Sequence, residues 1–460
     1  MASRRGLAAF VAPLFILAAC TESATPPQAT APPDAFASTP TIGPSTTTRP
    51  ATTTTLDAER VVLQRVDPVS LEPMTAFEPI PMGDALWGSV ASSDGRYLAA
   101  TVDAAGSGVP EMRLVDLQSW MPVTSWPESG DFMFHIDQHG SVFYVTYGAT
   151  AEFRFAATDS TGSTLITSLP AHYGLWGAES VTEALFLLYG TKPAEPGSER
   201  QEQVFVATVQ LDEAGAVLAE IPLPGAVIGQ VDPVSQGPWA GYLYTSPSFT
   251  WDPVGARLLV VHGDEDVISE VDIETGQVVE HTTAGTVDLQ LGARRLSALS
   301  PDGRLLYVAT RTVELVEDDD DWMVITRPGG VKTIDTTTWE MVVRTDEPIS
   351  DIWVSPNGAL LGSGYTTEES ESIYLQDSTG LYLLDPSDLS IRVHYPPESP
   401  DQWWGPVTFS ESGSIAYAST WVQNPRVHVI EMATGEFLST AESTETLEML
   451  GTVGVLATNR

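Results

Sequence analysis

The sequence contains very little cysteine and very little lysine. Cys20 is the only cysteine among 460 residues, which excludes intramolecular disulfides, CxxCH haem attachment and cysteine-cluster zinc sites. The only lysines are Lys192 and Lys332, and 21 basic residues stand against 61 acidic ones. Nucleic-acid binding is excluded because it needs cations that neutralise phosphate, and an anionic lipid surface is disfavoured for the same reason. The simplest consequence of the acidic balance is high solubility.

The chain also lacks the common catalytic motifs. It contains no GxSxG nucleophile elbow, no HExxH metal motif, no Walker loop and no GxGxxG dinucleotide loop. The sequence therefore assigns no catalytic residue, and an enzyme is the less favoured class of protein.

The first twenty residues predict a targeting signal. Arg4 and Arg5 precede an apolar run over residues 6–19 that is too short to span a bilayer as a helix. The run ends in Leu-Ala-Ala-Cys, which resembles a bacterial lipobox, in which the cysteine thiol receives a diacylglycerol. We therefore expect a signal peptide over residues 1–19 and an extracytoplasmic protein anchored to the outer face of the cell membrane through a lipid on Cys20.

A linker follows the lipidation site. Residues 20–57 are dominated by Thr, Pro, Ala and Ser, and such a composition cannot form a core. Hydrophobic residues make up 42% of the whole chain, so the remainder can bury one. The predicted folded domain spans residues 58–460, and the disordered linker holds it away from the lipid.

Beyond residue 58 the sequence repeats a pattern of four short β-strands. Its clearest marker is a hairpin turn that ends in Gly, followed by a strand rich in β-formers. Adjacent markers lie 45 to 55 residues apart, except for one interval of 115 residues that holds a repeat without the glycine. Four strands per repeat of this length are typical of a β-propeller blade. The marker residues are Gly95, Gly140, Gly255, Gly303, Gly358 and Gly413.

Seven such blades fit between residues 84 and 442. The remaining C-terminal strands, at 446–450 and 454–459, would join N-terminal strands at 61–67 and 74–79 in one composite blade. Such a blade closes the ring and removes exposed sheet edges. The predicted fold is an all-β propeller of eight four-stranded blades, with seven blades as the alternative if a terminal strand pair only extends an existing blade.

The segment from Ser300 to Thr310, SPDGRLLYVAT, resembles the repeats of YVTN and quinoprotein amine dehydrogenase-like propellers, which are WD-repeat-like; the YVT at 144–146 does so too. The resemblance implies a propeller over nearly the whole folded part. It implies no single function, because those families include enzymes, surface-layer modules and binding proteins. No catalytic set of these families matches positions in this sequence.

Long insertions are predicted on one face of the propeller. Loops from the second to the third strand, and from blade to blade, open on one face, while the short hairpin turns line the other. The long segments at 190–203, 225–246, 312–330 and 362–380 all fall on the first face, where repeat proteins usually carry function. Loop variation without selection is the alternative explanation.

Tryptophans and aspartates stand at the start of several first strands, where they would surround the mouth of the central channel. Aromatic walls with convergent carboxylates suit a sugar, a cationic group or a peptide. The competing interpretation is that the tryptophans fill the wedges between blades. The predicted ligand-binding residues are Trp87, Trp176, Trp353, Trp403, Trp404, Asp84, Asp131, Asp351 and Asp401.

Two acidic clusters could hold calcium through carboxylate oxygens. Neither has the glycine or the spacing of an EF-hand loop, so a solvated acidic loop is the competing interpretation. No other cofactor is indicated. The clusters are Asp264, Glu265 and Asp266, and Asp318, Asp319, Asp320 and Asp321.

Two functional hypotheses follow from these patterns. The favoured one is a membrane-anchored module that binds a protein or carbohydrate ligand through the insertion-rich face. The second is an enzyme at the channel mouth, either a metal-dependent lactonase-like hydrolase or a quinoprotein-type dehydrogenase, for which Asp84, Asp351 and Asp401 are the motivating carboxylates.

Overall fold

The structure is a computed structural model that describes most of residues 61–459. The predicted signal peptide, Cys20 and the linker lie outside the described residues, as do Asp131, Asp264 and Asp401. Within 61–459 the segments left out are 85, 93–94, 104–109, 128–131, 138, 148–149, 159–161, 171–172, 183, 195–201, 213–214, 224, 227, 231–243, 264, 284–292, 319–320, 367–376, 400–401, 422–425, 443–446 and 451–454.

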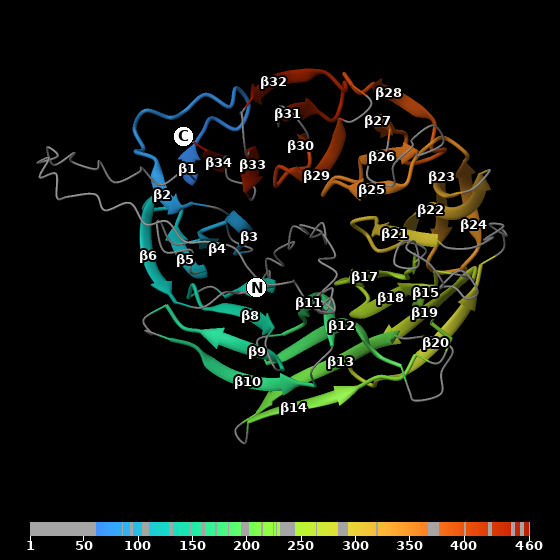
Figure 1. Cartoon of the computed structure of the whole chain (residues 1–460), viewed down its shortest axis with the longest axis horizontal. Coiled ribbons are helices and arrows are strands. Elements are labelled where there is room, and N and C mark those ends of the chain that lie inside the picture. Colours follow the sequence, from blue (N-terminus) through green and yellow to red (C-terminus); the bar gives the residue numbers. More distant parts are fainter. Residues whose placement is uncertain are drawn as a thin grey trace, which may run out of the picture. The chain divides into compact units, whose positions relative to one another are not determined.

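The described residues form antiparallel β-sheets arranged around a ring, and they contain no helix long and apolar enough to cross a membrane. Seven sheets each consist of four consecutive strands. In Figure 1 the first strand of a blade lies nearest the centre and the fourth lies at the rim. The prediction of an all-β propeller with four-stranded blades is confirmed.

The first three blades comprise β3 (Leu86–Ala91), β4 (Tyr97–Asp103), β5 (Pro110–Asp116) and β6 (Met121–Trp126); β7 (Phe132–Ile136), β8 (Val142–Tyr147), β9 (Ala151–Ala156) and β10 (Thr164–Leu169); and β11 (Gly174–Ser180), β12 (Leu185–Pro193), β13 (Glu202–Asp212) and β14 (Gly215–Glu220). A two-stranded sheet of β15 (Gly229–Gln230) and β16 (Tyr244–Thr245) precedes the fourth blade.

The remaining four blades of consecutive strands comprise β17 (Ser248–Asp252), β18 (Arg257–Val261), β19 (Val267–Asp272) and β20 (Val278–Thr282); β21 (Ala293–Leu299), β22 (Leu305–Asp318), β23 (Asp321–Asp335) and β24 (Met341–Thr345); β25 (Asp351–Val354), β26 (Leu360–Thr366), β27 (Asp377–Leu384) and β28 (Ile391–Tyr395); and β29 (Trp403–Phe409), β30 (Ile415–Trp421), β31 (Arg426–Glu431) and β32 (Phe437–Glu442).

A further four-stranded sheet combines strands from both ends of the described chain. Its order is β2 (Ile80–Gly83), β1 (Val61–Arg65), β34 (Val455–Asn459) and β33 (Leu447–Leu450), with Val61 paired to Asn459 and Arg65 paired to Val455. The second N-terminal strand was expected at 74–79, and it begins at Ile80 instead. The chain first turns back on itself, because the Asp67 carboxylate accepts the backbone N–H groups of two residues just after it and Leu71 takes a positive φ.

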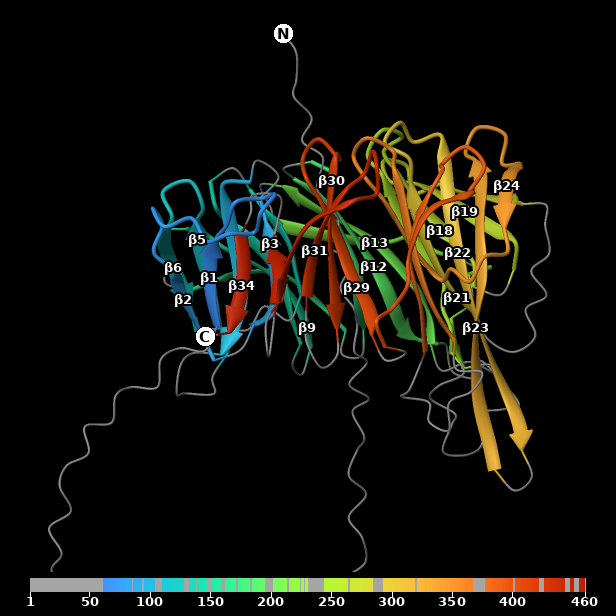
Figure 2. The same cartoon turned by 90° about the horizontal axis from the view of Figure 1, so that it is seen from above.

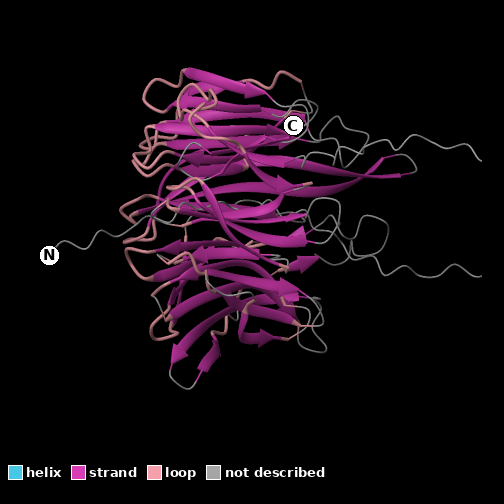
Figure 3. Cartoon of the chain, turned by 90° about the vertical axis from the view of Figure 1, so that its left-hand side faces the viewer, coloured by secondary structure: helices cyan, strands magenta, loops and turns pink. Residues whose placement is uncertain are grey.

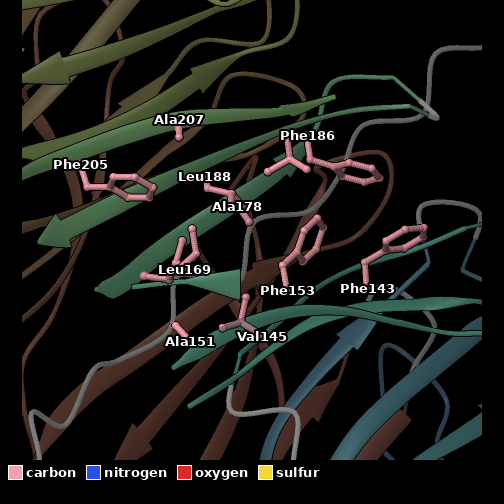
Figure 4. Close-up of a cluster of buried hydrophobic side chains, with 12 residues drawn as sticks. Phe143, Val145, Ala151, Phe153, Leu169, Ala178, Phe186, Leu188, Phe205 and Ala207 are labelled. Carbon is pink, nitrogen blue, oxygen red and sulfur yellow. The ribbon is translucent and has the colours of Figure 1, made fainter. Parts of the chain in front are cut away.

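This composite sheet packs on both sides. Leu63 and Met82 lie in one apolar cluster with Leu98 of β4, while Val66 lies in another with Tyr417 of β30. Apolar side chains fill the wedges between the other blades in the same way. Between the blades that begin with β7 and β11, the wedge contains Phe143, Phe153 and Phe186, whose ring centroids lie 5.0 to 6.5 Å apart (Figure 4).

Each turn between the first and second strands described next contains one residue in the left-handed backbone conformation, with positive φ. Gly95, Gly303 and Gly413 have positive φ, as the marker pattern predicts, but in the fourth blade Ala256 takes this conformation instead of Gly255. A second turn, from the third to the fourth strand, has its own left-handed residue: Trp120, Gly276, Trp339, Leu389 or Gly435. At two of these turns the preceding Asp116 or Asp335 accepts backbone N–H groups two and three residues on, which is the hydrogen bonding of an Asx turn.

Three of the four predicted insertions, at 190–203, 312–330 and 362–380, begin as extensions of the second and third strands, whereas the segment 225–246 lies between two blades. The segment 312–330 is a two-stranded ribbon and not a loop, since β22 and β23 stay paired from Leu305 with Asp335 to Asp318 with Asp321. Figures 2 and 3 show this ribbon extending past the other strands, on the face where first strands begin. The segment 190–203 begins in the same way, with β12 and β13 paired as far as Pro193 and Glu202.

Candidate ligand-binding face

The first strands of all blades begin on the same face, which is also where the second strands end; we name it the mouth face. Trp87 lies here and its side chain is 71% exposed. Its indole Nε1 donates a hydrogen bond to the Asp103 carboxylate at 3.0 Å, and the backbone N–H of Asp84, an exposed residue, donates to the Asp103 carbonyl oxygen. The Trp87 ring therefore faces the solvent, and the hydrogen bond from its Nε1 fixes its orientation.

Three of the predicted tryptophans pack mainly between blades. Trp404 is 5% exposed and lies in an apolar cluster with Trp353, and Trp176 packs edge-to-face on Phe249 of the next blade at 5.7 Å. These contacts agree with the wedge-filling interpretation for these three positions. They leave Trp87 and Trp403 as the tryptophans with the stronger case for ligand contact.

Asp351 and Trp403 are brought together by two residues that the sequence analysis did not single out. Asp351 opens β25 and accepts hydrogen bonds from the hydroxyls of Tyr365, at the end of β26, and Ser350. The Tyr365 ring stacks on Trp403 of the next blade with centroids 5.7 Å apart, and the Arg311 guanidinium lies 5.0 Å from the centre of the same ring. We name Asp351, Tyr365, Arg311 and Trp403 the mouth cluster.

Burial controls the electrostatics of the mouth cluster. Asp351 is 7% exposed, and desolvation raises the pKa of its carboxyl against the opposing influence of Arg311 and of the Tyr365 hydrogen bond. Desolvation and the Asp351 charge also raise the pKa of Tyr365, which keeps the phenol a hydrogen-bond donor. Arg311 and Trp403 are partly exposed, so the cluster offers a cation and an aromatic face to a ligand.

A second acid with a raised pKa lies on the innermost strand of another blade, where it is partly buried. Glu179 of β11 is hydrogen-bonded to Tyr189 of β12, and desolvation raises the pKa of Glu179 to about 8. Gly177 makes room for this contact, because a Cβ there would lie 2.1 Å from the Tyr189 ring. Tyr189 in turn stacks on Phe249 of the next blade at 4.9 Å. The same residue types recur in the mouth cluster, but Glu179 lies near the end of its first strand whereas Asp351 opens its own.

The sequence contained one signal for these residues. In an antiparallel blade, residues near the start of the first strand face residues near the end of the second. An aspartate that opens a first strand therefore predicts contacts with the end of the following strand, which is where Tyr365 lies. Glu179 gives no such signal, because its burial depends on packing from the neighbouring blade.

One of the predicted calcium ligands, Asp266, has another role in the structure. Asp266 forms ion pairs with Lys332 and with Arg295, the latter at 3.4 Å, so protein cations already neutralise its carboxylate. Asp318 and Asp321 are opposite each other at the tip of the β22–β23 ribbon, and Glu265 is exposed. Among the described side chains no group of three potential ligands is positioned to hold a metal ion, while Asp264, Asp319 and Asp320 lie outside the described residues.

Comparison with known proteins gives likenesses of fold. No family model and no curated protein matches the chain. Similar solved structures include the dihydro-heme d1 dehydrogenase NirN in complex with DHE, at 17% identity over 87% of this chain and 74% of that chain, with a TM-score of 0.46. The β-propeller domain of Swd1 from Myceliophteria thermophila has 11% identity over 81% and 98% of the two chains and a TM-score of 0.40.

A third likeness is to a putative 6-phosphogluconolactonase from Bacteroides fragilis, at 10% identity over 84% of this chain and 99% of that chain, with a TM-score of 0.43. At these identities and TM-scores, none of the three supports an inference about function. The strand topology alone places the chain among β-propellers.

Proposed function

We propose that this protein is a lipid-anchored extracytoplasmic propeller that binds a protein or carbohydrate ligand through its mouth face. The observation that carries the proposal is the β22–β23 ribbon. Its neighbours β21 and β24 pair with it only as far as Thr312 and Val331, so beyond these residues the described ribbon has two strands. A two-stranded hairpin alone is marginally stable in water, and open strand edges are templates for pairing with another chain.

The residue content of the ribbon supports a partner as well. Apolar residues are backbone pairing partners across it, with Leu315 opposite Val324 and Val316 opposite Met323. The tip is acidic, and the chain carries a net charge of −40. Because two copies of such a chain repel each other, a different molecule is the favoured occupant.

Shortening the ribbon tests this function. Residues 313–326 are replaced by Asn-Gly, a two-residue hairpin turn, in a Cys20→Ala background so that lipid does not anchor the protein. We expect an unchanged melting temperature, because the four-stranded part of the blade is kept, together with loss of retention on cell envelopes of the source cells. Equal retention of the shortened and full-length proteins would contradict the proposal.

The anchoring part of the proposal rests on the N-terminal sequence and is tested separately. Cys20→Ala removes the thiol that would carry the diacylglycerol. We expect the protein to move from the membrane fraction to the soluble fraction, because the proposed lipid is its stable attachment. Unchanged fractionation would refute the anchor without affecting the proposed role of the mouth face.

We further propose that the composite sheet is an eighth blade that closes the ring. Support comes from its packing on the blades that begin with β3 and β29. A ring of seven blades with an appended sheet is the alternative. In that case one of these two contacts would be dispensable for stability.

An enzyme at the channel mouth is the second candidate function. Glu179 supports an enzyme in general terms, since a carboxyl with a pKa of about 8 holds its proton at neutral pH and could act as a general acid, but it lies near the end of β11, away from the mouth face. The test is turnover of lactone and sugar substrates by the Cys20→Ala protein, before and after treatment with a chelator. Turnover that is lost in Glu179→Gln, while the melting temperature is kept, would place the enzyme ahead of the binding module.

A further inference from the structure

Four buried polar atoms in the blade that begins with β29 have no hydrogen-bond partner among the described residues. They are Trp404 Nε1 of β29, Thr420 Oγ1 of β30, and Arg426 Nε and His428 Nε2 of β31. The exposed fractions of Trp404, Thr420 and His428 are only 5%, 2% and 5%. A buried polar atom without a partner loses its hydration without compensation, so four of them in one blade point to a bound group.

The four atoms belong to side chains on the same face of the sheet, near its mouth-face end. Trp404 pairs with Thr420, and Thr420 pairs with Arg426; side chains of directly opposite residues lie on one face, with Cβ atoms about 4.5–5.5 Å apart. His428 follows Arg426 by two residues on the same strand, so its side chain faces the same way. Its ring centroid lies 5.1 Å from that of Trp404. This face packs on the preceding blade, because Trp404 shares an apolar cluster with Leu383 of β27.

The charges beside these atoms argue against a bound ion. The Arg426 guanidinium already forms ion pairs with Glu398 and with Glu442, the latter at 2.9 Å, so carboxylates outnumber the cation and would repel an anion. Burial, with Arg426 nearby, lowers the pKa of His428 to about 4, so its ring is neutral at neutral pH. Trp404 Nε1 and Arg426 Nε can only donate hydrogen bonds, so they cannot bind a cation.

The hydrogen-bonding capacities of the four atoms match those of water. Trp404 and Arg426 each offer an N–H to a water oxygen, and the Thr420 hydroxyl can accept a hydrogen bond from the water. His428 Nε2 can also accept one when Nδ1 carries the ring proton and donates it to Thr440 Oγ1, 3.1 Å away. A buried water typically makes about three hydrogen bonds to groups of this kind.

We infer that an ordered water is bound between Trp404, Thr420, Arg426 and His428 and joins β29, β30 and β31. The backbone pairing of β29 with β30 is interrupted after Trp404, where Pro406 has no N–H to donate. The water would therefore connect the start of β29, which carries Trp403 of the mouth cluster, to the rest of its blade. This inference is independent of the proposed ligand.

The test is nuclear magnetic resonance of the isotope-labelled Cys20→Ala protein, which detects magnetisation transfer from water to the indole N–H of a tryptophan. Trp404→Phe identifies the Trp404 signal among those of the 12 tryptophans. We expect a water cross-peak at the Trp404 indole. Trp120 is the matched control, because it is 8% exposed and its indole donates directly to the Glu78 carbonyl oxygen at 2.6 Å, and it should show none.

Thr420→Val separates a bound water from the Thr420 hydroxyl, whose proton exchanges with solvent and can transfer magnetisation in the same way. The variant keeps the shape of the side chain and leaves the water three partners, so the cross-peak should persist. No cross-peak at Trp404, or one that disappears in Thr420→Val, would overturn the inference. A crystal grown in sodium bromide gives a second check: density at hydrogen-bond distance from Trp404 Nε1 without an anomalous bromide signal supports water, and a bromide signal there would contradict it.

Discussion

At the scale of single residues, the hydroxyl of Tyr365 has the clearest energetic role. It donates to the buried Asp351 carboxyl, so Tyr365→Phe leaves that acceptor without this donor while keeping the ring on Trp403. We expect a loss of about 1–3 kcal/mol in the free energy of unfolding, measured by urea titration. Tyr147→Phe is the control. The Tyr147 hydroxyl accepts a hydrogen bond from the Leu175 N–H at 2.7 Å, but Tyr147 is 43% exposed. Water can therefore replace the lost hydroxyl, and the loss in the free energy of unfolding should be smaller.

Glu179 predicts a pH dependence of stability. Its pKa is about 8 in the folded protein and 4.5 without burial, so between these values the folded form holds a proton that the unfolded chain has lost. The free energy of unfolding contributed by this group therefore falls as the pH rises from 4.5 to about 8. We expect Glu179→Gln to have a higher melting temperature than the wild type at pH 9 and the same melting temperature at pH 4, as followed by circular dichroism. A constant difference across the range, or the same effect from Glu265→Gln at an exposed site, would contradict this assignment.

At the scale of elements, the blades depend on glycines where strands and turns come close. Gly330 of β23 has a φ of 78°, and a Cβ there would lie 2.0 Å from the Thr345 carbonyl oxygen. Gly276 has a similar φ, but its nearest neighbour would be 3.8 Å away. Gly276→Ala should cost about 1 kcal/mol from the left-handed backbone alone, and Gly330→Ala clearly more, in urea unfolding. Equal losses would show that the contact at Gly330 relaxes freely.

The elements were largely predictable from the sequence, and the mouth cluster was predictable only in part. Turn glycines and alternating apolar residues define strands locally, which is why blades and their order could be predicted. Asp351 and Trp403 were found by their position at strand starts, whereas Arg311 joins them across a blade boundary that no local pattern describes. The sequence predicts an insertion loop at the β22–β23 ribbon because the run of four aspartates at 318–321 interrupts the β-branched and apolar residues on either side of it.

At the scale of the whole molecule, the two ends of the folded chain share one sheet. Deleting residues 447–460 removes β33 and β34, and with them the pairing of β34 with β1 and the Val455 side chain from the apolar cluster that holds Leu63 and Leu98. We expect a single cooperative transition at a much lower temperature by calorimetry, because opening the proposed ring would remove contacts at both edges of the gap. A deletion variant that melts like the intact protein would contradict ring closure by the composite sheet.

Cross-linking tests most directly whether the mouth face is the functional face of the propeller. A photoreactive benzoylphenylalanine is placed at Trp87 on the mouth face, or at the exposed Thr337 in the turn on the opposite face, and intact source cells are irradiated. We predict covalent adducts from position 87 and none from position 337. Adducts formed only from position 337, or equally from both, would contradict the assignment of the mouth face.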